Sequence, residues 1–237
     1  MNHLPVLFIA LLVLLLREVP YSDPCEDAKS GAARATGFVK DAVFNAAFKN
    51  ITQAFQSDMK EHAVTFGKDA SNNIFSSGIT NGSATGGTVP GIKNAFADLH
   101  NHPNNTPPDA GDLYGLIDIK RNNNGYHSRF VVTPAGTVYA LLVTNPAAAA
   151  AFNINYARQV PAFPGGPPGF PVSIVDEFRE IKYQYNGTDE MAMAFILEKY
   201  QAGISLLKQD SNGVFKKLRT VVSGEGGHLI FTATNCP

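Results

Sequence analysis

A chain of 237 residues, 44% hydrophobic and only 16% charged, is long enough to bury the core of one domain. Its formal net charge is -1 at pH 7, and no segment is rich in lysine or arginine. These properties argue against a nucleic-acid partner, because domains that bind nucleic acid carry a basic face. They leave the oligomeric state open.

The first 22 residues contain a hydrophobic segment. An almost unbroken apolar run covers Leu4 to Leu16, whereas a helix that spans about 30 Å of hydrocarbon needs about 20 residues. The run therefore predicts the core of a signal peptide within 1–22, and hence a secreted, periplasmic or cell-surface protein. The alternative is an uncleaved N-terminal anchor, which would be the chain's route to a membrane.

The two cysteines lie near opposite ends of the predicted mature chain, Cys25 after the apolar segment and Cys236 one residue from the end. In an oxidising compartment they could pair and join those ends. For so long a loop the chain-entropy model gives a stabilisation of about 4 to 5 kcal/mol as an upper figure. The alternative is two unpaired thiols.

Helices followed by strands are predicted for the next part of the chain. The alanine-rich stretch 26–55 repeats its larger apolar residues every three or four positions, which is typical of an amphipathic helix or helix pair. A strand is predicted at 61–66, and a turn leads from it into a second strand at 74–79. The Gly-, Ser- and Thr-rich stretch 81–91 is predicted to be a loop beside the site described next.

Two of the six histidines, His100 and His102, follow a short strand predicted at 95–99. Residues i and i+2 of a strand point to the same face, so both imidazoles project together. Pro103 cannot donate a ladder hydrogen bond, which ends the strand beside them.

A helix is predicted directly after this strand end. Asp109 is a good N-cap for it, and Asp112 then falls in its first turn, where it can face the histidines. Two imidazoles and one carboxylate form a three-ligand zinc site with the fourth position left for water. Two simpler alternatives stay open: the acids are only a capping box, or the His-x-His pair lies on a strand edge without a metal.

Residues 100–103, His-Asn-His-Pro, and 108–112, Pro-Asp-Ala-Gly-Asp, together resemble a known signature. It is the His-x-His-Pro and Pro-Ser-x-x-Asp pattern of the JAB/MPN (JAMM) metallopeptidases, especially their bacterial RadC-like and JAB-like toxin forms. The resemblance covers about residues 55–152, and we assign 26–160 to a JAB-like metal-binding domain. It implies a mixed sheet flanked by helices, with cytidine deaminase-like layering.

The resemblance also implies roles for individual residues. Zinc would be held by His100, His102 and Asp112, and Glu61 lies in the place of the family's general base. Glu61 could also be a solvated residue at the end of a strand. Because peptide or isopeptide bonds are the family's substrates, a peptide or protein substrate is implied.

Two features depart from the family signature. Asp109 replaces the serine whose hydroxyl is thought to stabilise the oxyanion, and the loop after His102 is one residue shorter. An ionised carboxylate cannot donate a hydrogen bond. Either Asp109 is protonated or turned away as a helix cap, or another group such as Thr106 donates, or the site binds metal without efficient hydrolysis.

Only local patterns are available for the rest of the chain. A hairpin is predicted at 129–143 and a helix from Pro146, followed by a Pro- and Gly-rich linker at 161–171. The remainder, 172–237, is predicted to be an extension of helices, a hairpin and a last strand, packed on the same domain. His127, in a polar stretch, is predicted to lie on the surface.

The sequence thus predicts an α/β (α+β) fold, a mixed β-sheet flanked by helices with a C-terminal helix and β-hairpin extension. The leading functional hypothesis is a secreted or envelope-associated zinc-dependent amide hydrolase. The alternative is a catalytically impaired, JAB-like binding or structural module outside the cytoplasm. An HNH-type nuclease is a weak third option, because those enzymes space their histidines and asparagine much further apart.

Overall fold

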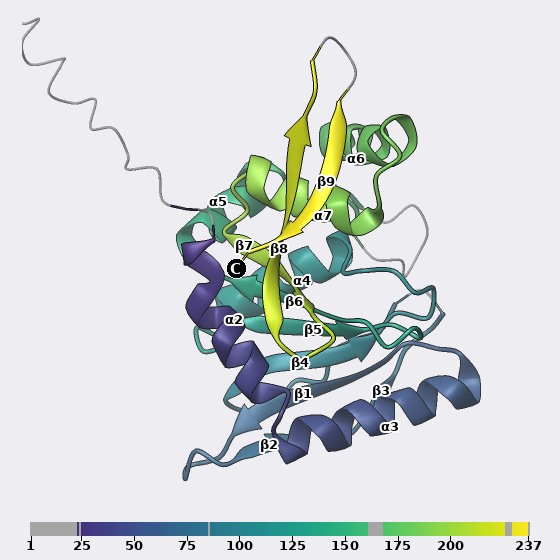
Figure 1. Cartoon of the computed structure of the whole chain (residues 1–237). Coiled ribbons are helices and arrows are strands. Elements are labelled where there is room, and N and C mark those ends of the chain that lie inside the picture. Colours follow the sequence, from purple (N-terminus) through teal and green to yellow (C-terminus); the bar gives the residue numbers. More distant parts are fainter. Residues whose placement is uncertain (1–22, 24, 85, 161–167, 226–228, 237) are drawn as a thin grey trace, which may run out of the picture.

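A mixed β-sheet forms the centre of the molecule (Figure 1). The computed structural model describes residues 23, 25–84, 86–160, 168–225 and 229–236. Nine strands run in the order β2-β1-β4-β5-β6-β7-β8-β9, with β3 beside β1. Their bounds are β1 (His62–Lys68), β2 (Ile74–Ser76), β3 (Thr80–Asn81), β4 (Ala95–Asn101), β5 (Ser128–Val132), β6 (Val138–Val143), β7 (Ile204–Gln209), β8 (Phe215–Ser223) and β9 (Ile230–Asn235).

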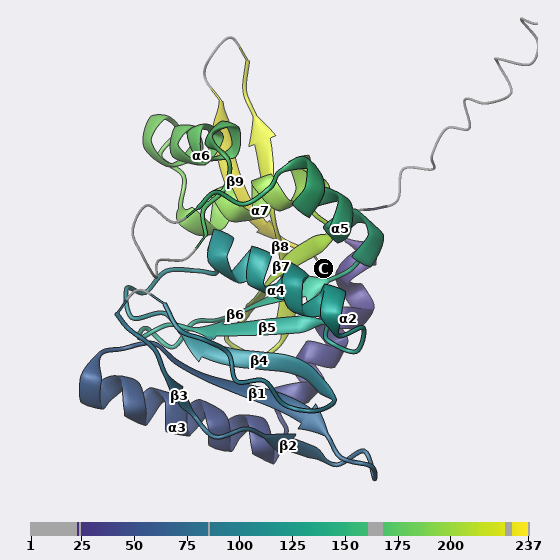
Figure 2. The same cartoon turned by 180° about the vertical axis from the view of Figure 1, so that it is seen from behind.

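Helices cover both faces of this sheet, which confirms the predicted α+β class (Figures 1 and 2). The helices α2 and α3 pack on one face, and those from α4 onward lie on the other. Their bounds are α2 (Glu26–Phe38), α3 (Ala42–Asp58), α4 (Ala110–Asn122), α5 (Pro146–Asn155), α6 (Val172–Arg179), α7 (Asp189–Lys199) and a π-helical segment, η1 (Glu180–Gln184). The helix pair expected within 26–55 is α2 and α3.

Side-chain caps explain where four of these helices begin. Asp41, Asp109, Asn145 and Thr188 each accept a hydrogen bond from a backbone N–H in the first turn of the helix that follows. Such caps satisfy N–H groups that have no partner inside the helix. The start of α4 is therefore fixed at Asp109, as predicted.

Strand β4 separates two cores by the alternation of its side chains. Ala97 and Leu99 belong to the core under α2 and α3. The residues between and after them, Asp98 and His100, therefore face α4. β4 pairs in parallel with β5, and α4 is the connection between the two strands. Ligand sites commonly form where such strands end, at the start of the connecting helix.

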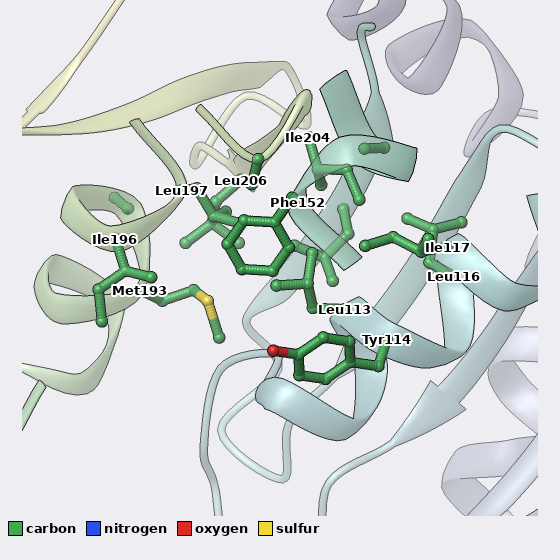
Figure 3. Close-up of a cluster of buried hydrophobic side chains, with 14 of the residues drawn as sticks. Leu113, Tyr114, Leu116, Ile117, Phe152, Met193, Ile196, Leu197, Ile204 and Leu206 are labelled. Atoms are coloured by element: carbon green, nitrogen blue, oxygen red, sulfur yellow. The ribbon is translucent and has the colours of Figure 1, made fainter. Parts of the chain in front are cut away.

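The C-terminal segment continues the same sheet instead of forming a separate unit. Strand β7 pairs with β6, and β8 and β9 follow it. Figure 3 shows side chains from α4, α5, α7 and β7 meeting in one cluster, among them Leu113, Phe152, Met193 and Leu206. At the end of the predicted linker, Phe170 is buried in this cluster and Gly169 bridges to Gln159. The linker residues 161–167 lie outside the described part of the chain.

A disulfide joins Cys25 to Cys236, with their Cα atoms 5.6 Å apart, and confirms the predicted pairing. The bond indicates an oxidising compartment outside the cytoplasm. The segment 1–22, predicted to be a signal peptide or anchor, lies outside the described residues. Within the described ranges, no helix has the length and hydrophobicity that a membrane span requires.

Candidate metal centre

Three potential metal ligands meet where β4 ends and α4 begins. Nε2 of His100 lies 3.2 Å from Nε2 of His102 and 2.9 Å from Oδ1 of Asp112. Nε2 of His102 lies 3.2 Å from Oδ2 of Asp112. All three side chains are buried, and together they form a group that could hold a metal ion. The structure therefore brings together the ligand set that the sequence predicts.

The two imidazole nitrogens are spaced as two ligands of one metal ion would be. Zinc binds imidazole nitrogen and carboxylate oxygen at about 2.0 to 2.2 Å, which places two tetrahedral ligands about 3.3 Å apart. The two imidazole nitrogens lie 3.2 Å apart, close to that value, and each approaches a different oxygen of Asp112, at 2.9 and 3.2 Å. Three protein ligands would leave a fourth position for water.

Neighbouring acceptors fix the tautomer of His102. Its Nδ1 lies 3.1 Å from both the carbonyl oxygen and the hydroxyl of Thr106, and 3.2 Å from the carbonyl oxygen of Pro107. Carbonyl oxygens only accept, so Nδ1 carries the proton and Nε2 presents its lone pair to the site. Thr106, weighed as an oxyanion donor, is instead placed to support a ligand.

Asp98 supports His100 in the same way. Its Oδ1 lies 3.4 Å from Nδ1 of His100, and its Oδ2 accepts hydrogen bonds from Arg129 Nε, at 3.0 Å, and from the Tyr126 hydroxyl. Burial of Asp98 opposes its ionisation, but the charge of Arg129 and the contacts with His100 and Tyr126 together outweigh that cost and lower the pKa. A buried, ionised carboxylate therefore lies behind the first imidazole.

Arg129 also links this carboxylate to the third ligand. Its Nη1 donates to the backbone carbonyl of Asp112 at 3.2 Å and lies 3.7 Å from the Asp112 carboxylate. The pKa of Asp112 is held well below its usual value, because attraction to both histidines outweighs its burial. For His100 the same attraction outweighs burial and raises the pKa to about 10. The cluster is thus electrostatically complementary.

Glu61 lies beside the three ligands, immediately before β1. Its Oε1 is 4.0 Å from Nε2 of His100, and Ala63, two residues on, pairs with His100 across the sheet. Burial raises the pKa of Glu61, which makes its carboxylate a stronger base. Glu61 is thus largely buried at the site and not a solvated residue at the end of the strand.

Asn101, the residue between the two histidines, holds the backbone on both sides of Glu61. Its Oδ1 accepts from the N–H of His62 at 2.8 Å, and its Nδ2 donates to the carbonyl of Lys60 at 3.0 Å. The predicted loop 81–91 also contacts Glu61, whose N–H donates to the carbonyl of Ser83 at 2.8 Å. The general-base position is therefore tied to β4 and to the loop.

Asp109 and Asp112 form a reciprocal capping box. Oδ1 of Asp109 accepts from the N–H of Asp112 at 3.1 Å, and Oδ2 of Asp112 accepts from the N–H of Asp109 at 3.0 Å. The capping box is therefore present, and it coexists with the position of Asp112 beside the two histidines. Burial and the nearby charge of Asp112 raise the pKa of Asp109.

A cleft of about 580 Å³ gives access to these groups. It is lined by Glu61, His100, His102, Asp109, Asp112 and Arg129, together with glycines of the 81–91 loop. Its volume falls in the range of known ligand sites. The arrangement combines metal ligands, an adjacent base and space for a substrate.

Four supporting residues were not singled out from the sequence: Asp98, Asn101, Tyr126 and Arg129. Asp98 had a usable signal, because it stands two positions before His100 and shares its strand face. Tyr126 and Arg129 had none, because the parallel pairing of β5 with β4 brings them to the site.

Comparisons with protein-family models, curated proteins and solved structures gave no match.

Proposed function

We propose that this protein is a secreted or envelope-associated, zinc-dependent hydrolase of amide bonds with a JAB/MPN-like site. One observation carries the proposal: His100, His102 and Asp112 converge, with the carboxylate of Glu61 4.0 Å from His100. Mixed imidazole and carboxylate ligands suit zinc, and a three-ligand set is typical of catalytic zinc. The resemblance of residues 100–112 to the JAMM signature supports the same reaction class.

His100, His102 and Asp112 would hold the zinc ion, which would supply a Lewis acid able to polarise the scissile carbonyl and to lower the pKa of a water molecule towards 7. Glu61 would accept the proton of that water and deliver it to the leaving amine. Its burial, which raises its pKa, suits both steps, because the group must take a proton and then release it. Zinc binding would require His100 and His102 to give up any proton on Nε2 and act as neutral ligands. Asp98 and Thr106 would orient the two rings through the Nδ1 protons.

Asp109 would take the place of the family's serine as an oxyanion donor in its protonated form. The raised pKa of this carboxyl favours that form, and Asp109 lines the cleft. A donor placed beside the reacting carbonyl typically contributes a factor of 10² to 10³ to turnover.

The second candidate is a non-catalytic, zinc-binding module. The hydrogen bond from Asp112 N–H to Asp109 favours it, because a carboxylate engaged as a helix cap is stabilised in its ionised form and then cannot donate. Hydrolysis of an unbiased peptide library by the wild type and by Glu61→Gln separates the two candidates. Equal background rates would select the module.

Elemental analysis of the purified full chain tests the metal centre itself. We expect one equivalent of zinc in the wild type and its loss in His102→Ala. Lys93→Ala, in the segment before β4, is the matched control and should keep the metal. A folded wild-type protein that takes up no zinc would overturn the proposal.

A further inference from the structure

A second, more apolar cavity lies beside the metal cleft. Its volume is about 750 Å³, in the range of pockets that hold a drug-sized ligand. Apolar and aromatic side chains of the C-terminal segment form much of its wall: Phe170, Val175, Phe178, Tyr183 and Met193. The stretch that joins β4 to α4 lines the cavity as well, with Asn104 and the residues from Thr106 to Ala110.

The cavity and the metal cleft adjoin at two places. Asp109 lines both of them, and Pro168 lines the cleft while the next residue, Gly169, lines the cavity. Thr106 and Pro107 line the cavity, and their carbonyls are also the acceptors for Nδ1 of His102. One thickness of backbone therefore separates the apolar cavity from a metal ligand.

We propose that this cavity binds an apolar side chain of a peptide substrate, aromatic or branched aliphatic, next to the scissile bond. The inference rests on the proposed function, and it adds a sequence preference to it. A chain lying across the cleft would pass Asp109 and could place a neighbouring side chain among Val175, Phe178 and Met193. Burial of a large apolar side chain there should tighten binding by about 10- to 100-fold.

The lining of the cavity is held in place on one side by the hydrophobic core. Met193 is only 1% exposed and packs in the central cluster of α4, α5 and α7 (Figure 3). Tyr183, by contrast, is 72% exposed where it lines the cavity, so its ring is accessible to an incoming group. The C-terminal extension would thus supply the specificity of a site whose chemistry comes from β4 and α4.

Binding can be tested without turnover, by NMR of the ε-methyl groups of methionine. The full chain carrying Glu61→Gln, loaded with zinc, is titrated with N-acetyl-phenylalanine amide and with N-acetyl-glycine amide. We expect a saturable shift of the Met193 methyl with the phenylalanine compound only. Met59, which is 59% exposed and lies outside the cavity, serves as the internal reference.

Two substitutions in α6 provide a matched pair. Val175→Asp places a charge in the cavity and should weaken binding at least tenfold. Val172→Asp, three residues earlier on the same helix and 69% exposed, does not line the cavity and should leave binding unchanged. Tyr183→Ser removes an aromatic ring from the cavity lining and should also weaken binding. Because Tyr183 is exposed, this substitution should have little effect on folding.

The outcomes separate this inference from the proposed function. No Met193 shift at millimolar ligand, or equal effects of Val175→Asp and Val172→Asp, would overturn the apolar subsite even if the wild type cleaves peptides. Cleavage sites without an apolar neighbour would do the same. Equal hydrolysis by wild type and Glu61→Gln, with a normal Met193 shift, would instead refute the hydrolase and leave the binding pocket established.

Discussion

The carboxylate of Asp98 lies 3.4 Å from Nδ1 of His100, two residues further along β4. It thus contacts the imidazole on the side away from the nitrogen that faces His102 and Asp112. Partners in this position hold the ring and make it a better ligand, and their loss typically costs a factor of 10 to 100 in metal affinity.

Asp98→Asn should therefore weaken zinc binding by about 10- to 100-fold, as measured by competition with a chromophoric chelator. Tyr126→Phe is the control, because it removes a hydrogen bond to the other oxygen of Asp98 and leaves His100 untouched. An affinity of Asp98→Asn equal to that of Tyr126→Phe would contradict the supporting role.

Gly115 lies in α4 directly against Arg129. A Cβ at this position would come within 2.5 Å of Nη1 of Arg129, which is itself held by Asp98 and Asp112. Gly115→Ala should therefore displace the guanidinium and lower zinc affinity several-fold, although alanine favours the helix by about 1 kcal/mol. Gly37→Ala, where the Cβ would meet open space, should leave zinc affinity unchanged.

Glu61→Gln should lower the rate of amide hydrolysis by about 10² to 10⁴-fold, because the amide cannot accept the proton of the attacking water. Its zinc content should match that of the wild type, since Glu61 is not one of the three ligands. Asn101→Ala should give a smaller loss of rate by freeing the backbone around Glu61. Loss of zinc in Glu61→Gln would assign that residue to the ligand set.

Replacing both cysteines of the Cys25–Cys236 bond by serine should lower the free energy of unfolding by up to about 5 kcal/mol. The loop that the bond closes spans a sequence separation of 211 residues, so the unfolded chain gains much entropy when it opens. Denaturation in guanidinium chloride, with and without reductant, measures the change. A reductant-insensitive midpoint in the wild type would show that the bond does not form.

His127 should make the fold sensitive to acid. Burial, together with the charges of Arg34, Lys120 and Lys68, lowers its pKa from 6.5 to about 4. Between pH 6.5 and about 4 the unfolded chain binds a proton at His127 that the folded chain does not. The free energy of unfolding should therefore be highest above pH 6.5 and fall as the pH drops towards 4. Because His127 is partly exposed, the expected loss in the free energy of unfolding is about 2 kcal/mol.

His127→Gln should flatten this part of the stability curve, and the difference between variant and wild type from pH 6.5 to 4 isolates the effect from other groups. The same slope in both proteins would contradict the assignment. The prediction of His127 as a surface residue was only partly correct, because its ring is half-buried against Phe96.

The ligand set could be predicted because it depends on local rules. His100 and His102 share a strand face, and Asp109 fixes the first turn of α4, which places Asp112 opposite them. Arg129 and Tyr126 could not, since Arg129 lies in the next parallel strand and Tyr126 just before it, and nothing local marks their contacts with Asp98. The continuation of the sheet through β7 was also beyond local pattern, which predicts strands but not their neighbours.

The bond between Cys25 and Cys236 has a consequence for a protein exposed to proteases. It connects the start of α2 to the end of β9, so one cut in any intervening loop leaves both fragments covalently attached. A nicked molecule could therefore keep its two pieces at high effective concentration and retain its ligand site.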